Sequence, residues 1–443
     1  MSISNAECKV LVLTIGTGNT DNLENSLYAP LAKSIDTGSW DRIVLLPSQR
    51  TVEQANEMRR RITKLSAEVC PIPGAGSEND ADASFAHFDK ILGEIIESDG
   101  AAPKAITLDF TRGTKAMSAA LVLAGVARGI PALRYIEGKR GKRGSVVAET
   151  EVIKEVRTVV ASARQLINLA ERLMLRGDFE AVRTMHAEMS SALEKLPEQL
   201  HSRLNAYAHV AAIYAAWDRF DYCHACGLLS DHRETVSAAG QFKPTPDMEQ
   251  WMGRLAAHPD RDKHEERAAY LRYLACDLLA NAERRYRDGL FEDAGLRWYR
   301  LLELIGQARL FDHGYDSGRL PGNDPKVKGF NDKLRKGNSS PLASRPKIEG
   351  ILLASRLQTA RFLKYLGDSL ATRLLHEDNK DYVKARNDGL LAHGFDAQAS
   401  QLTPERIRSV IENFEQLLCE DRHEAREWLA VARSLDFRNL IET

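Results

Sequence analysis

Near its N-terminus the chain reads Lys9-Val-Leu-Val-Leu-Thr-Ile15-Gly16-Thr17-Gly18-Asn19, an apolar run that ends in a glycine-rich loop. A short apolar run bounded by turn residues is typical of a strand buried on both faces of a parallel sheet. Similar runs follow at residues 42–46, 68–71 and 105–109, and helix-favouring stretches alternate with them. The pattern predicts a doubly wound, Rossmann-like α/β domain over residues 1–157.

The expected helices of this domain are residues 23–34, 51–65, 83–98 and 114–127. Residues 132–136 and 145–153 read as two further strands, which flank a glycine-rich, basic hairpin tip at residues 138–144.

Sheets of this class bind ligands beyond the carboxyl ends of their strands, so the loops that follow the strands are candidate sites. The loop Gly16, Thr17, Gly18, Asn19 allows a close backbone approach and leaves amides free for a polar or phosphate group. A dinucleotide fingerprint needs a third glycine where Asp21 stands, which argues against a dinucleotide-dependent oxidoreductase.

The loop after the fourth strand is Asp109-Phe-Thr111-Arg112-Gly113-Thr114-Lys115. Thr111 or Gly113 could cap the following helix, and Lys115 could reach an anion. Helix capping alone does not explain cationic side chains at an N-terminus whose dipole is already positive. We expect an anionic ligand, although the segment is not a P-loop because G-x-x-x-x-G-K is missing.

The pattern D-x-T-x-G-T-K-x-M from Asp109 to Met117, with the Gly16–Asn19 loop, resembles the CARF domain of type III CRISPR systems. Ser48 and Gln49, which end the second strand, fit a third contact loop of that family. The resemblance implies that residues 8–155 sense a cyclic oligoadenylate, such as cyclic tetra- or hexa-adenylate, across the two-fold axis of a homodimer. Many relatives have a second glycine where Arg112 stands here.

From about residue 159 onward the pattern is helical, which predicts an all-α region divided into a spacer, residues 158–280, and a C-terminal bundle, residues 281–443. In the bundle, Arg386 and His393 are seven residues apart, so a helix would present both on one face about 10 Å apart. A guanidinium can hold a phosphate and an imidazole can move protons at neutral pH. Ten ångströms is wide for one phosphate, so two antiparallel copies are expected to share the site.

Arg386-Asn387 followed by His393-Gly resembles the R-N-x-H signature of HEPN ribonucleases. The resemblance implies cleavage of single-stranded RNA without a metal ion, with a 2′,3′-cyclic phosphate product. Arg386 would bind the scissile phosphate, His393 would act as general acid or base, and Asn387 would orient both.

Three other parts of the sequence also carry recognisable patterns. Leu169–Glu180 and Asn281–Glu292 share Ala-Glu-Arg, Gly and Phe-Glu at matching offsets, which predicts two helix–glycine turn–helix motifs. Cys223 and Cys226 supply only two ligands and would need His232 and Cys276 for zinc, so two buried helix cysteines are expected and no metal site. Residues 313–347 are rich in Gly, Ser, Pro and basic residues, which predicts a long surface loop, either solvated or guiding RNA.

The 443 residues carry a formal net charge of −1, which excludes a globally basic nucleic-acid coat, and six dispersed cysteines, which fit a reducing cytoplasm. Neither a signal pattern nor an apolar run of membrane-spanning length is present.

Because the two resemblances occur in the order found in CARF–HEPN proteins, the predicted function is a cyclic-oligoadenylate-activated endoribonuclease of antiviral defence. Two alternatives remain open. The helical half could be inert in a sensor or adaptor, or the N-terminal domain could itself cleave the cyclic ligand, with Thr17, Thr111 or Lys115 aligning a ribose hydroxyl.

Overall fold

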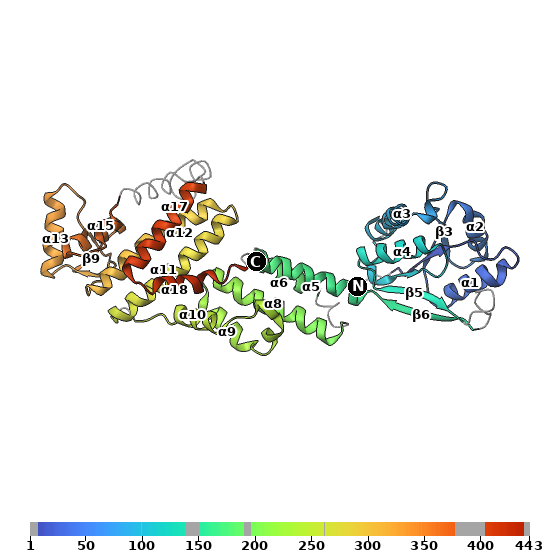
Figure 1. Cartoon of the computed structure of the whole chain (residues 1–443), viewed down its shortest axis with the longest axis horizontal. Helices are drawn as coiled ribbons and strands as arrows, with labels where there is room; N and C mark the ends of the chain where they lie inside the picture. The colour runs from blue at the N-terminus through green and yellow to red at the C-terminus, as the bar shows by residue number, and fades with distance from the viewer. Residues whose placement is uncertain are drawn as a thin grey trace, which may run out of the picture. The chain divides into compact units, whose positions relative to one another are not determined.

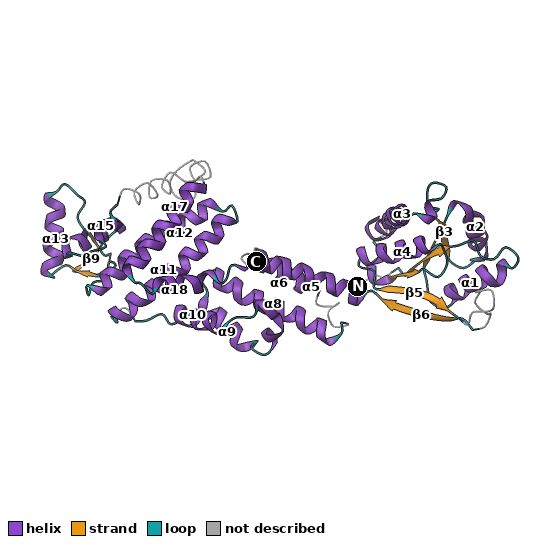
Figure 2. Ribbon diagram, in the orientation of Figure 1, coloured by secondary structure: helices purple, strands orange, loops and turns teal. Residues whose placement is uncertain are grey.

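The computed structural model describes residues 8–98, 100–138, 150–189, 196–260, 262–346, 348–376 and 404–437. The chain forms two compact units: residues 1–168 with 191–201, and residues 169–190 with 202–443. The first is an α/β unit and the second is almost wholly helical (Figures 1 and 2).

The α/β unit is built on one six-stranded sheet, in the order β3-β2-β1-β4-β5-β6. Neighbouring strands from β3 to β5 run parallel and β6 pairs antiparallel with β5. The strands are β1 (Val10–Ile15), β2 (Arg42–Pro47), β3 (Ser66–Val69), β4 (Ile106–Asp109), β5 (Ala132–Glu137) and β6 (Val152–Arg157).

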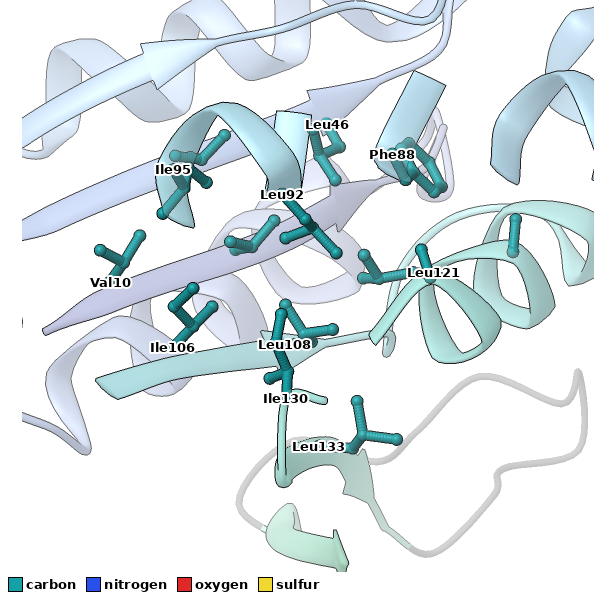
Figure 3. Close-up of a cluster of buried hydrophobic side chains, with 14 of the residues drawn as sticks. Val10, Leu46, Phe88, Leu92, Ile95, Ile106, Leu108, Leu121, Ile130 and Leu133 are labelled. Carbon is teal, nitrogen blue, oxygen red and sulfur yellow. The ribbon is translucent and has the colours of Figure 1, made fainter. Parts of the chain in front are cut away.

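Helices cover both faces of this sheet, because its central strands are apolar on both sides. On one face the apolar side chains of α3 (Ala81–Gly93) and α4 (Lys115–Ala127) pack on alternate residues of β1, β2 and β4, with Phe88, Leu92 and Leu121 at the centre (Figure 3). On the other face α1 (Ala29–Asp36) and α2 (Val52–Arg61) cover the remaining strand residues. The predicted α/β class is confirmed.

Most predicted elements of this unit lie within a few residues of the observed ones. A π-helical turn (Glu24–Tyr28) precedes α1, and another (Glu94–Ser98) extends α3. The last strand differs: it was expected at residues 145–153, but β6 begins at Val152 and continues to Arg157. The register explains the difference, since Ala132, the first residue of β5, pairs with Arg157 and so draws the partner strand beyond 153.

The helical unit is organised around the hairpin of α11 and α12. Its helices are α6 (Phe179–Glu188), α9 (Tyr222–Asp231), α10 (Pro246–Ala256), α11 (His264–Arg287), α12 (Phe291–Asp312), α13 (Pro325–Lys336), α14 (Arg356–Leu366), α15 (Ala371–Leu374), α17 (Pro404–Asp421) and α18 (Ala425–Arg433), together with a 3₁₀ helix (Thr235–Phe242). The division between the units falls inside α5 (Val159–Arg176) and α8 (Glu198–Asp218).

The two helix–glycine turn–helix motifs predicted from sequence are both present. Gly177 separates α5 from α6 and Gly289 separates α11 from α12, and each glycine has φ of 76°, which L-residues rarely adopt. The helix α11 is continuous through residue 280, where the sequence suggested a boundary between spacer and bundle. The division into 1–157, 158–280 and 281–443 stays a prediction.

The prediction of a surface loop at residues 313–347 is wrong for part of this stretch. It forms α13 and the strands β7 (Leu320–Pro321) and β8 (Ala343–Ser344), which pair with β9 (Ile351–Leu353) in a three-stranded sheet ordered β7-β9-β8. Val327, Phe330 and Leu334 are buried on one side of α13. Their spacing of three and four residues is an amphipathic stripe that the many surrounding lysines and glycines obscure in the sequence.

Candidate functional site

The candidate ligand site lies at the carboxyl edge of the α/β sheet. There β1 lies between β2 and β4, so the loops that follow these three strands are neighbours at one edge. The edge also contains the topological switch point, because the strand order runs outward from β1 in one direction and from β4 in the other.

The loops after β1 and β4 touch through their glycines. A Cβ placed on Gly16 would lie 2.8 Å from the backbone nitrogen of Gly113, a distance that side chains do not tolerate. Gly113 has φ of 131°, and a Cβ there would meet Thr14 at 3.2 Å. The structure therefore brings together two of the glycines that the sequence predicts at the ligand site.

The rest of the first loop is open to solvent. Thr17, Gly18 and Asn19 are exposed, and Gly18 has φ of 65°. The hydroxyl of Ser26 accepts a hydrogen bond of 2.7 Å from the Asn19 amide and donates to the carbonyl of Asn22 at 2.6 Å. These bonds hold the loop against the start of the π-helical turn, while Thr17 stays accessible.

The Ser48 and Gln49 side chains are held by the protein itself. Ser48 is buried in a capping box with Thr51, whose hydroxyl donates a 2.9 Å bond to the carbonyl of Ile15 and so ties the end of β2 to the end of β1. The Gln49 amide donates to the carbonyl of Ile72 at 2.7 Å. Both residues shape the edge of the sheet, and their predicted ligand contacts stay predictions.

Asp109 is an internal anchor of the second loop. It is buried and accepts hydrogen bonds from the Ser34 hydroxyl and from the hydroxyl and the amide of Thr111, the last at 2.9 Å. Arg134 lies 3.4 Å from the same carboxylate and also donates to Ser34. The Thr111 hydroxyl in turn accepts a 2.9 Å bond from the amide of Ile136, so it is fully engaged.

Thr114, and neither Thr111 nor Gly113, caps α4. Its hydroxyl accepts a 3.1 Å hydrogen bond from the Met117 amide and donates to the carbonyl of Glu78. Thr111 cannot serve as the cap because its side chain is bound to Asp109. The residue that follows the cap, Lys115, is exposed at the helix N-terminus.

Cationic groups gather at this edge of the sheet. Arg112 is half-buried, burial lowers its pKa, and its Nε has no hydrogen-bond partner among the described residues. Sequence reasoning missed Arg50, which directly follows Gln49, is 76% exposed and lies 3.5 Å from the buried carboxylate of Glu78. With Lys115 at the N-terminus of α4, the edge can bind an anion.

The predicted catalytic residues Arg386, Asn387 and His393 lie outside the described residues. What the structure describes is the framework on both sides of their segment, from α14 and α15 before it to α17 after it. Arg373 of α15 donates to Glu420 and Asn413 of α17, at 3.2 and 3.3 Å, so the elements before and after the segment are tied together.

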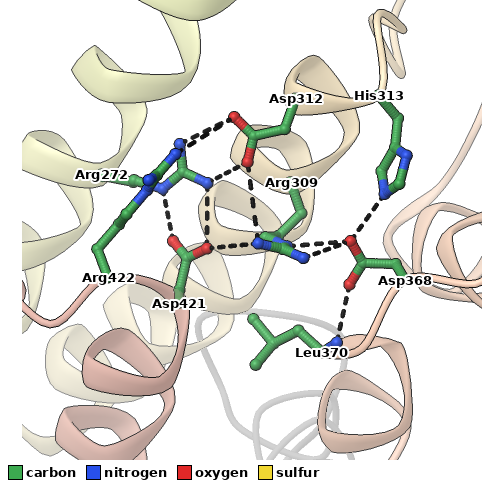
Figure 4. Close-up of polar contacts among 8 residues, drawn as sticks. All are labelled: Arg272, Arg309, Asp312, His313, Asp368, Leu370, Asp421 and Arg422. Carbon is green, nitrogen blue, oxygen red and sulfur yellow. Dashed lines mark hydrogen bonds and ion pairs between the residues drawn. The ribbon is translucent and has the colours of Figure 1, made fainter.

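A buried ionic network lies beneath this framework (Figure 4). Arg272 of α11 binds Asp312 of α12 and Asp421 of α17. Arg309 contacts Asp421 and Asp368, at 3.4 and 2.7 Å. Three helices are thereby joined by alternating charges.

Asp368 sits at the edge of that network, just before α15. It also lies 2.8 Å from His313 and accepts a 2.8 Å bond from the Leu370 amide. Burial raises the pKa of Asp368, but the bonds from Arg309, His313 and Leu370 outweigh it and leave the pKa below its ordinary value.

The cysteines of α9 differ from expectation in their burial. Cys223 is exposed and Cys226 is half-buried, so the expectation of two buried helix cysteines is wrong, whereas Cys276 is buried against the carbonyl of Ala425. Within the described parts of the chain, no group of three His, Cys, Asp or Glu side chains could hold a metal ion. Among the same residues, no helix combines the length and the apolar character needed to cross a membrane.

The chain resembles known proteins in sequence over part of its C-terminal half and in fold over almost its whole length. Residues 263–418 match the family model described as the Csm6 HEPN domain. No curated protein sequence matches the chain. The structure of Enterococcus italicus Csm6 bound to cyclic hexa-2′-fluoro-hexa-dAMP is similar over 97% of this chain and 99% of that one, with a TM-score of 0.54 and 13% identity.

A second solved structure, Can2 from Sulfobacillus thermosulfidooxidans in complex with cyclic tetra-adenylate, aligns with 47% of this chain and 66% of that chain. Its TM-score of 0.23, at 12% identity, is too low to support an argument. The Csm6 likeness establishes the fold: a six-stranded α/β unit followed by a helical region that contains an HEPN domain.

Proposed function

We propose, from the premise that the chain is a CRISPR-associated CARF–HEPN protein, that it is an endoribonuclease switched on by a cyclic oligoadenylate. The observation that carries the proposal is the match of residues 263–418 to the Csm6 HEPN domain, because this stretch contains Arg386, Asn387 and His393. The cationic, glycine-lined edge of the α/β sheet supports an anionic activator.

In the proposed reaction the 2′-hydroxyl of single-stranded RNA attacks the adjacent phosphorus and the 5′-oxygen leaves. Arg386 binds the scissile phosphate and stabilises its developing charge. His393 takes the proton from the 2′-hydroxyl or supplies one to the 5′-oxygen, and Asn387 orients the two. The products are a 2′,3′-cyclic phosphate and a free 5′-hydroxyl, and no metal ion takes part.

At the α/β unit, Lys115, Arg112 and the Gly16–Gly18 part of the loop after β1 are proposed to bind the phosphates of the ring. Thr111 and Asp109 support the loop after β4 from behind through their own hydrogen bonds. A two-fold homodimer would let one ring bridge two copies of this edge and would let two copies of Arg386 and His393 share one RNA site.

The test uses the purified full chain with a fluorophore-quenched RNA in EDTA, adding cyclic tri-, tetra- and hexa-adenylate in turn. We expect cleavage with one ring size. The Arg386→Ala and His393→Ala variants should cleave the RNA at least a hundredfold more slowly than the wild type. Cleavage that needs added divalent metal would overturn the metal-free mechanism. A thermal shift with one ring but no cleavage by the wild type would leave a sensor without nuclease activity.

A further inference from the structure

The helices α13 and α14 present a continuous basic face with no assigned role. Helix α13 carries five lysines or arginines against Asp332, and α14 carries three cations and no acidic residue. The whole chain has a net charge of −1, so this charge is concentrated locally. Local excess of one sign on a neutral protein attracts an oppositely charged partner.

Helical spacing aligns three of the α13 cations along one strip of the helix. Lys326, Lys333 and Lys336 are seven and three residues apart, and all three are exposed. Along α13 they extend over about 15 Å. The neighbouring strip of the helix is buried, through Val327, Phe330 and Leu334.

The two helices meet through an aromatic cluster that makes the surface continuous. Phe330 of α13 and Tyr365 of α14 both contact Phe362, with Phe330 and Phe362 centroids 4.9 Å apart. The ammonium of Lys333 lies 5.6 Å from the Tyr365 ring. The hydroxyl of Tyr365 would be 2.7 Å from a Cβ on Gly329, so the missing side chain lets the ring lie against α13.

Helix α14 adds its own cations beside that ring. Arg361 and Lys364 are exposed, and Tyr365 follows on the same side. Arg361 donates to the Ser339 hydroxyl at 3.2 Å, which fixes the turn after α13 to α14. We define the basic face as Lys326, Lys333, Lys336, Arg361, Lys364 and Tyr365.

The lysines of this face form no close ion pair with the described parts of the chain. None of Lys326, Lys333, Lys336 and Lys364 has a described carboxylate within 4.0 Å, and Asp324, at the start of α13, acts on Lys326 from a longer distance. Tyr365 is 40% exposed although it is a large aromatic side chain. Unpaired cations beside an exposed aromatic ring are the combination that binds the backbone and the bases of single-stranded nucleic acid.

We propose that the basic face is a docking surface for single-stranded RNA, which adds a second contact to the substrate besides the residues proposed to cleave it. RNA is the substrate class of the proposed function, and on that point the inference rests on it. The lysines bind phosphates and Tyr365 stacks on a base. Long RNA gains from this contact, whereas a substrate too short to reach it does not.

The first experiment measures binding without cleavage, by fluorescence anisotropy of a labelled 20-nucleotide single-stranded RNA with the full-length His393→Ala protein. The variant Lys326→Gln, Lys333→Gln, Lys336→Gln is compared with a charge-matched control, Arg172→Gln, Arg176→Gln, Lys243→Gln, whose three cations are exposed elsewhere on the same unit. We expect the first to weaken binding at least tenfold at 100 mM salt and the control less than twofold. The slope of log K against log salt should fall by about 2 in the first variant.

The second experiment separates RNA from an acidic protein partner. Tyr365→Ala should weaken RNA binding about tenfold while Tyr365→Phe restores it, and polyglutamate binding should not respond to either change. The proposal would be overturned if the lysine triple variant lost affinity equally for RNA and polyglutamate while Tyr365→Ala had no effect, because the face would then be a general polyanion surface. It would also be overturned if the lysine triple variant and its charge-matched control bound RNA with equal affinity.

A third measurement keeps this inference apart from the proposed function. This measurement uses activated protein in which His393 is retained. There the three lysine substitutions should raise KM for the 20-nucleotide RNA about tenfold and leave kcat unchanged. The KM for a four-nucleotide substrate should not change. If the wild type binds RNA through the basic face but never cleaves it, the proposed nuclease is wrong and the docking surface stands. If the wild type cleaves RNA and the triple variant has the same KM, the proposed docking surface is ruled out and the proposed nuclease activity stands.

Discussion

The Nε of Arg272 lies 2.6 Å from Oδ2 of Asp421, and the two side chains are only 4% and 1% exposed. They join α11 to α17, and Asp312 of α12 completes the contact from the other side of the guanidinium. Hydrogen bonds to both carboxylates outweigh the effect of burial and raise the pKa of Arg272. The charge is therefore fixed inside the helical unit.

Arg272→Ala should lower the free energy of unfolding of the helical unit by about 3–5 kcal/mol, because it removes the nearer counter-charge of the buried Asp421 and leaves only Arg309, 3.4 Å away. Arg422→Ala is the matched control: Arg422 approaches the same Asp312 at 4.0 Å but is 50% exposed, and its loss should cost less than about 0.5 kcal/mol. Tryptophan fluorescence during urea unfolding measures both. Equal effects of the two changes would contradict a buried network.

Asp368→Asn should change the pH dependence of stability. Because the pKa of Asp368 is lowered in the fold, the carboxylate stabilises the protein above the unfolded value of about 3.9, and this stabilisation disappears as pH falls through the folded pKa. The stability difference between wild type and Asp368→Asn should be constant from pH 7 to about 5 and shrink below about 4. Unfolding curves at each pH measure it, and a difference that does not shrink argues against the shift.

Asp277 accepts three hydrogen bonds in the core of the helical unit. They come from Nε1 of Trp217 at 2.8 Å, Nε1 of Trp251 at 3.1 Å and the hydroxyl of Tyr222 at 2.8 Å. Asp277→Ala leaves three buried donors without an acceptor, and each unsatisfied donor costs about 1–3 kcal/mol. The free energy of unfolding should therefore fall by more than about 3 kcal/mol. Asp277→Asn keeps one acceptor oxygen and should lower the free energy of unfolding less than Asp277→Ala does. Chemical unfolding of both variants measures this difference. A less stable Asp277→Asn variant would be incompatible with these contacts.

Gly16→Ala should impair the proposed activator site, because the new methyl group would lie 2.8 Å from the backbone of Gly113 and push the two loops apart. We expect cyclic oligoadenylate to bind at least tenfold more weakly by calorimetry. Gly227→Ala is the control. Gly227 lies inside α9 with nothing within 4 Å of an added Cβ, so the change should stabilise the helix by about 0.5–1 kcal/mol and leave binding intact.

The α/β unit was predictable from sequence because its strands are continuous runs of Val, Ile and Leu bounded by turn residues. Such runs fix both the strands and the parallel class. The residue that caps α4 was harder to predict, because Thr111 and Thr114 are both threonines near its start. Asp109 and Ile136 decide between them, since both form hydrogen bonds with Thr111 in the folded protein. A single sequence does not contain that tertiary information.

The fold of residues 313–347 escaped prediction for a different reason. The burial of α13 rests on three apolar side chains among many lysines and glycines, so composition resembles that of a loop. The buried network of Arg272, Arg309 and Asp368 was equally hidden, since charged residues on a helix usually face water. In both places the deciding partners are far away in the sequence.

The bonds of α11 have one further consequence, for synthesis of the chain. Arg272 finds Asp421 after 149 residues, Glu283 finds Arg433 after 150, and Arg287 finds Asp436 after 149. At roughly 5–20 residues per second, the ribosome needs about 7–30 s to supply those partners. Until then the buried side chains of Arg272 and Glu283 lack these partners. The contacts that join α11 to α17 and α18 therefore form only after residues 421–436 have been synthesised.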